Sequence, residues 1–151
     1  MGAAFFYHMT RTPLARTLPV LLEKSVEAGW KVLVRVPSEE RAIWLDDLLW
    51  TCDPDRFLPH GRAGGDDDAH QPILIATPDR VFDRAALVSV EGSPVSPDEV
   101  EASERCMILF DGASAEAVAQ ARVTWKALTA AGCAAKYWSQ EDGPWKMKAE
   151  A

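Results

Sequence analysis

The sequence predicts a three-layer α/β fold, with a mostly parallel sheet and helices on both faces. Short apolar segments alternate along the chain with segments whose apolar residues recur at helical spacing. The turns between the first four segments are short, as they are in strand, helix, strand units. A continuous apolar run at residues 106–110 is typical of a strand that is buried on both faces. Together these features favour a parallel sheet flanked by helices.

The first strand and the first helix come from the N-terminal segment. Residues 3–8 are a short apolar run that suits a buried strand. Pro13 suits the start of a helix, and Gly29 supplies its stop. Pro19 lies inside this helical pattern, so either the helix kinks there or its true start is near Leu18.

The second strand and the second helix follow directly. Residues 30–36 are rich in β-branched side chains, which favours a strand. Glu39 and Glu40 are acidic residues of the kind that stabilise the first turn of a helix. Apolar residues then recur at helical spacing, and Trp50 is the expected last residue of this helix.

The second half of the chain predicts four more strands and one long helix. Residues 91–104 are polar and contain two prolines, so no element is predicted there. Ser114 is the expected N-cap of the last helix. The expected strands are residues 72–76, 86–90, 106–110 and 133–138, and the expected helix runs from Ser114 to about Ala131.

The chain length favours a single domain. With 151 residues, the chain is long enough to bury a sizeable core, and it shows no internal repeat. We expect residues 1–140 to form the domain and residues 141–151 to be a flexible tail.

Composition limits the classes of function. No apolar run approaches the roughly 18 residues of a membrane span, and the N-terminus lacks the features of a secretory signal, so a cytoplasmic location is expected. The net charge of -7 argues against broad, direct binding to DNA. Three scattered cysteines favour buried, inert thiols over disulfides or structural zinc.

Motifs for catalysis or cofactor binding are missing from the sequence. It contains neither the G-x-G-x-x-G pattern after the first strand nor a G-x-x-x-x-G-K-[ST] pattern. The expected fold is therefore Rossmann-like in topology but without a nucleotide-binding loop, and no cofactor is expected. No nucleophile elbow is present either, so we expect no catalytic activity.

The glycine-rich loop at residues 61–70, from Gly61 to His70, offers an alternative function. Together with His60, its three consecutive aspartates and His70 have side chains that suit a divalent metal ion. A loop of this composition lacks the supporting contacts that metal sites need, so no metal site is predicted. An uncharacterised α/β enzyme or small-ligand-binding domain that uses this loop remains the second hypothesis.

A polar stripe marks one side of the last helix. Arg122, Lys126 and Thr129 are spaced i, i+4 and i+7, and Trp125 borders them. From these residues alone, the stripe is either a solvated face or a binding surface.

Two separate motifs resemble the chi subunit of bacterial DNA polymerase III. The first is an L-D-x-x-L-W run followed by F-x-P-H, formed here by Leu45, Asp46, Leu49, Trp50, Phe57, Pro59 and His60. The second comprises Arg122, Trp125, Lys126, Ala131 and Gly132. The two motifs are far apart in the chain but have the order and spacing of that family.

This resemblance implies a non-catalytic adaptor of the replication machinery. It implies that Arg122, Trp125, Lys126 and Trp50 bind the acidic C-terminal tail of the single-stranded-DNA-binding protein. In this reading Arg122 pairs with the terminal carboxylate, Lys126 neutralises tail aspartates, and the two tryptophans wall an apolar pocket.

The resemblance also implies that a second surface, which includes Phe57 and Pro59, docks the psi subunit of the clamp loader. DNA would be contacted only indirectly. No membrane partner is implied.

Overall fold

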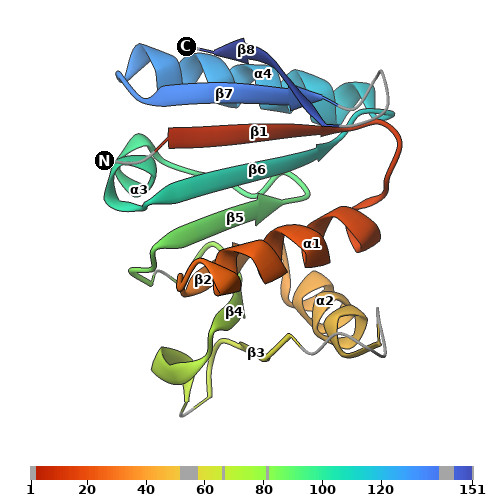
Figure 1. Cartoon of the computed structure of the whole chain (residues 1–151), viewed down its shortest axis with the longest axis vertical. Helices are drawn as coiled ribbons and strands as arrows, with labels where there is room; N and C mark the ends of the chain where they lie inside the picture. The colour runs from red at the N-terminus through yellow and green to blue at the C-terminus, as the bar shows by residue number, and fades with distance from the viewer. Residues whose placement is uncertain (1–2, 52–57, 66, 81, 140–144, 151) are drawn as a thin grey trace.

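One sheet organises the chain, as the computed structural model shows (Figure 1). The structure describes residues 3–51, 58–65, 67–80, 82–139 and 145–150. The strands are β1 (Ala3–Met9), β2 (Val32–Arg35), β3 (His60–Arg62), β4 (Ile73–Ala76), β5 (Ala86–Val90), β6 (Arg105–Asp111), β7 (Ala134–Ser139) and β8 (Lys146–Glu150). The helices are α1 (Leu14–Glu27), α2 (Glu39–Thr51), α3 (Pro97–Ala102) and α4 (Ala115–Ala130), with a 3-10 turn η1 (Asp68–His70).

The strand order is β3-β4-β2-β5-β6-β1-β7-β8. Every neighbouring pair is parallel except β7 and β8, which are antiparallel. Strand β1 lies between β6 and β7, with Phe6 opposite both Ile108 and Tyr137. Parallel neighbours need crossover connections, and helices supply most of them. The predicted three-layer α/β class is confirmed.

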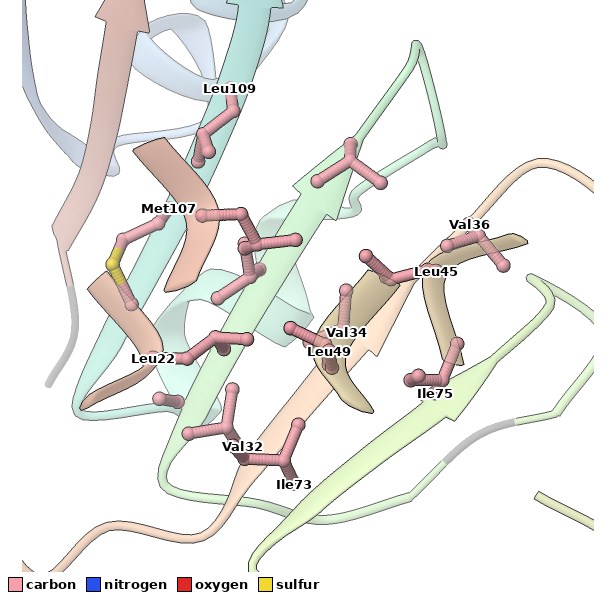
Figure 2. Packing of buried hydrophobic residues seen from close by; sticks show 14 of the residues in the cluster. Leu22, Val32, Val34, Val36, Leu45, Leu49, Ile73, Ile75, Met107 and Leu109 are labelled. Carbon is pink, nitrogen blue, oxygen red and sulfur yellow. The ribbon is translucent and has the colours of Figure 1, made fainter. Parts of the chain in front are cut away.

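Two hydrophobic cores cover the two faces of the sheet. Helices α1 and α2 pack on one face, where Leu22, Leu45 and Leu49 meet the valines of β2 (Figure 2). Helices α3 and α4 pack on the opposite face, where Leu128 joins Phe6 and other buried strand residues. Figure 1 shows α1 and α2 in front of the sheet and α4 behind it. The sheet therefore separates α2 from α4.

Helix α1 includes Pro19, so the alternative start near Leu18 is wrong. The helix begins at Leu14, with Pro13 in extended backbone conformation at the N-cap. Pro19 costs the helix one backbone hydrogen bond. Leu18 and Leu22 are fully buried against the sheet, and this packing compensates for the missing bond.

Helix α3 lies in the polar stretch where no element was expected. Ser96 caps it with a reciprocal capping box to Glu99, and Pro97 occupies its first turn. The S-x-x-E pattern with a proline was therefore a usable signal. Arg35 of β2 holds the helix through two hydrogen bonds to the Glu99 carboxylate, of 2.8 and 2.5 Å.

Strand β8 lies within residues 141–151, where a flexible tail was expected. Residues 146–150 pair antiparallel with β7, and Lys136 lies 3.6 Å from the Glu150 carboxylate. Trp145 packs edge-on against Tyr7, with ring centroids 5.3 Å apart. These are tertiary contacts, and the short charged segment has no strand signal of its own. No helix among the described residues is long and apolar enough to cross a membrane.

Candidate functional site

Helix α4 carries most of the residues predicted to bind a partner. It begins after Ser114, whose hydroxyl oxygen accepts a hydrogen bond from the Ala117 backbone N–H at 3.2 Å. Ala121 and Leu128 are its buried residues and fix the side that faces the sheet. The other positions of α4 are exposed or half-buried.

Arg122 and Lys126 are exposed and lie one turn apart on α4. Neither forms an ion pair or a side-chain hydrogen bond with any other residue that the structure describes. Thr129, the third member of the predicted stripe, instead donates its hydroxyl to the Trp125 carbonyl at 2.9 Å. The two cations therefore form the exposed charged part of the stripe.

Trp125 is half-buried beside these cations. Its ring meets Phe6 of β1 in a T-shaped arrangement, with centroids 5.2 Å apart. Val118 and Tyr137 are also half-buried and pack against the same core. Val118 lies four residues before Arg122, and Trp125 lies three residues after it. Both therefore share the side of the helix that carries Arg122.

Trp50 lies on the other face of the sheet. It is near the end of α2, which packs with α1, whereas Trp125 is on α4. The structure therefore does not bring the two tryptophans together, and the expectation that they wall one pocket is corrected. The sequence could not reveal this, because the separation depends on which face each crossover helix covers.

His60 joins the end of α2 to β3. Its Nδ1 lies 2.6 Å from the Leu58 carbonyl oxygen, and its Nε2 lies 3.1 Å from a carboxylate oxygen of Asp46. The His60 side chain is buried, and the Trp50 ring lies over it with centroids 4.6 Å apart. We call this arrangement of Asp46, Trp50, Leu58 and His60 the α2–β3 clamp.

The clamp explains much of the first motif. Leu45, Leu49 and Leu58 are buried in the core. Trp50 is 56% exposed, and Pro59 is half-buried. Phe57 lies outside the described residues. The motif thus combines residues that hold the fold with an aromatic side chain that remains accessible.

The segment at residues 61–70, expected to be a loop, includes the end of β3 and the 3-10 turn η1, and it is held by local and long-range contacts. The Asp68 carboxylate accepts hydrogen bonds from the Gly64 and Gly65 backbone N–H groups, at 2.9 and 3.1 Å. Arg84 donates to the Asp68 carbonyl at 2.6 Å. Within the described residues, no group of three His, Cys, Asp or Glu side chains could hold a metal ion. Asp66 lies outside the described residues.

Two of the cysteines are buried in the core of the α4 face. Cys106 is inaccessible, and its burial raises the pKa of the thiol to about 12. Cys133 is also buried. This agrees with the predicted buried thiols, while Cys52 lies outside the described residues.

Comparison with known proteins places the chain in a family. The model of the family described as DNA polymerase III chi subunit, HolC, matches residues 1–136, which include everything from β1 to the beginning of β7. The DNA polymerase III subunit chi of Haemophilus influenzae is 39% identical over 49 residues. That alignment covers 32% of this chain and 34% of the relative, so it spans about a third of each. The chain belongs to the DNA polymerase III chi subunit family.

Proposed function

We propose that this chain acts in DNA replication as a non-catalytic accessory subunit of DNA polymerase III. It would join the clamp-loader complex, through the psi subunit, to the C-terminal tail of the single-stranded-DNA-binding protein. Membership of the chi family supports this role. The structure contributes two separate accessible surfaces, as a protein that connects two partners requires.

The tail site is proposed on α4, and one observation carries the proposal. Arg122 and Lys126 are exposed cations without an ion pair in the described part of a chain whose net charge is -7. Such a local cationic site suits an acidic peptide with a free terminal carboxylate. A guanidinium group binds a carboxylate through two parallel hydrogen bonds, whereas an ammonium group acts as a point charge. Arg122 is therefore assigned to the terminal carboxylate and Lys126 to the acidic side chains.

The apolar wall of this site comes from α4 and its neighbours. Val118 and Trp125 share the side of α4 that carries Arg122, and the half-buried Tyr137 of β7 packs against the same core. A terminal apolar side chain of the tail would contact this group. Trp50 is not included in the proposed wall, because α2, which carries it, packs on the opposite face of the sheet.

The psi-docking surface is proposed at the α2–β3 clamp. Trp50 is 56% exposed there, although it lies against the buried His60 ring. Pro59, predicted to dock psi, immediately precedes His60 in the chain. Trp50 is therefore reassigned from the tail site to this surface, together with Pro59 and Phe57. An exposed aromatic ring on a rigid support is a common anchor in protein interfaces.

Substitution of Arg122 tests the tail site. Arg122→Ala should weaken binding of a synthetic acidic tail peptide by about 2 to 5 kcal/mol if the pair is partly desolvated in the complex. Arg122→Lys should also bind weakly, because it keeps the charge and loses the two-pronged geometry. Calorimetric titration measures both affinities, and a peptide without its last residue shows whether the terminus is read.

Arg16→Ala is the matched control, because Arg16 is an exposed arginine on α1. It should leave the affinity nearly unchanged. If Arg122→Ala binds the full tail as well as the unmodified protein does, the exposed cations of α4 only keep that face soluble.

A further inference from the structure

A crevice of about 660 Å³ opens at the carboxyl ends of three parallel strands. It is bordered by the ends of β1, β5 and β6, by the starts of α1 and α4, and by Arg41 and Trp44 of α2. Its volume lies within the usual range for ligand-binding cavities, roughly 300 to 1,000 Å³. Neither the α4 cations nor the α2–β3 clamp belongs to it. We call it the strand-end crevice.

The topology of the sheet creates this crevice. Strands β1 and β6 are neighbours, but the chain leaves β1 for α1 on one face and leaves β6 for α4 on the other. Connections that diverge from adjacent parallel strands leave an opening at their carboxyl ends, and this is where open α/β sheets bind their ligands. The position therefore identifies the crevice as a candidate binding site, while the lining residues decide what it binds.

The floor of the crevice is apolar. Leu14, Ile108, Phe110 and Ala117 contribute to it. Three serines line the crevice. Ser89 donates its hydroxyl to the Ser93 carbonyl at 2.6 Å, Ser93 donates to the Val90 carbonyl, and Ser114 caps α4. A ligand would thus find an apolar surface in the middle, and its specificity would come from the charged rim.

The charges on the rim are mainly negative. Among the described residues, the charged side chains that line the crevice are Arg41, Glu91, Asp111 and Glu116. Arg41 Nε lies 2.9 Å from a Glu91 carboxylate oxygen, and its guanidinium carbon lies 4.1 Å from the centre of the Trp44 ring. Arg41 is therefore already paired. The exposed carboxylates of Asp111 and Glu116 remain to attract a cation, although one Asp111 oxygen also accepts a hydrogen bond from the Ala113 backbone N–H at 2.9 Å.

We propose that the strand-end crevice binds a basic segment of a protein partner through an arginine or lysine side chain. Such a side chain has an apolar stem and a charged head, which match the apolar floor and the two carboxylates. Phosphates, nucleic acids and acidic peptides carry the wrong charge for this rim. The proposal is independent of tail binding at α4.

The test follows backbone amide signals of the full chain by NMR during titration with acetyl-Gly-Arg-Ala-Arg-Gly-amide. The same peptide with citrulline in place of arginine is the control, because citrulline has nearly the same shape without the charge. We expect saturable shifts around Ser93, Asp111 and Gln120, and affinity at least tenfold higher for the arginine peptide. Equal affinities, shifts confined to other regions, or no shifts at millimolar peptide would overturn the proposal.

Two pairs of variants distinguish binding in the crevice from a general effect of surface charge. Gln120→Arg adds a positive charge to the rim, whereas Ala119→Arg adds it to the next, exposed position of α4 outside the crevice. Only Gln120→Arg should weaken binding of the arginine peptide, by about tenfold.

The double variant Asp111→Asn with Glu116→Gln should also weaken binding of the arginine peptide by about tenfold. The control double variant, Glu27→Gln with Glu104→Gln, changes two exposed carboxylates outside the crevice and should leave this binding unchanged. Equal effects within either pair would contradict a specific site. Spermidine is a further probe, and if it binds as tightly as the peptide, the crevice is a small-amine site and the partner proposal is wrong.

Discussion

The α2–β3 clamp carries the first family motif and the outer side of α4 carries the second. The two motifs differ in how far their residues are buried. In the clamp, Leu45, Leu49 and His60 are buried, and Asp46 contacts the His60 ring. On α4, Arg122 and Lys126 are exposed and make no ion pair within the described residues. The first motif is mainly required by the fold, with Trp50 as its accessible part. The second combines Trp125, which packs against Phe6, with two cations that the fold does not require. A shared motif therefore gives the family, and burial separates structural residues from candidate binding residues.

The largest expected effect comes from breaking the clamp. His60→Ala should lower the free energy of unfolding by about 3 kcal/mol, because it removes a buried ring together with its contacts to the Leu58 carbonyl and the Asp46 carboxylate. Denaturant titration measures the loss. His70→Ala is the control, because His70 is exposed on η1 and should cost under about 0.5 kcal/mol. Similar losses of stability in both variants would show that the clamp does not stabilise the fold.

The ion pair between the buried Arg35 and the half-buried Glu99, on the α4 face of the sheet, makes a pH-dependent contribution to stability. The hydrogen bonds from Arg35 lower the pKa of Glu99 in the folded protein below its ordinary value of 4.5. The stabilisation is therefore complete above pH 4.5 and is lost as the pH falls through the lower folded-state pKa.

Glu99→Gln should cost about 2 kcal/mol near neutral pH, because it leaves a buried guanidinium without its counter-charge. The variant should also lose less stability than the unmodified protein in acid. Thermal melts from pH 7 to pH 3 test this, with Glu101→Gln on the exposed side of α3 as the control. Parallel pH profiles for Glu99→Gln and the unmodified protein would count against the assignment.

Lys126→Ala tests the exposed cations of α4. It should weaken binding of the tail peptide by at most about 1 kcal/mol and should reduce the salt dependence of that binding, because an exposed pair is screened by ions. Titrations at several salt concentrations measure both effects. Lys24→Ala, an exposed lysine on α1, should leave the salt dependence unchanged. An unchanged salt dependence in Lys126→Ala would place the tail elsewhere.

Trp50→Ala should have the smallest effect on the tail site. The side chain is 56% exposed, so its removal should cost under about 1 kcal/mol of stability. Tail affinity should stay within a factor of two, while binding of psi should fall. Pull-down of psi and calorimetry with the tail peptide distinguish the two surfaces. A loss of tail affinity comparable to that of Arg122→Ala would return Trp50 to the tail site.

The sequence by itself determined the fold class and the family. Apolar runs of strand length, helical spacing and strong start and stop residues are local signals, so strands such as β6 and helices such as α4 were predicted close to their observed bounds. The motif residues were also recognisable, and the family match confirms the resemblance. Exposure of Arg122 and Lys126 followed from their helical spacing alone.

Only the tertiary structure decided how these parts combine. The separation of Trp50 from Trp125 depends on the face that each crossover helix covers, and residue spacing carries no information about that face. Strand β8 forms because β7 offers its edge and Tyr7 offers a surface to Trp145, although its own sequence is short and charged. The strand-end crevice likewise exists because β1 and β6 are neighbours whose chains diverge. Each of these features depends on contacts between residues far apart in the chain, which no local pattern specifies.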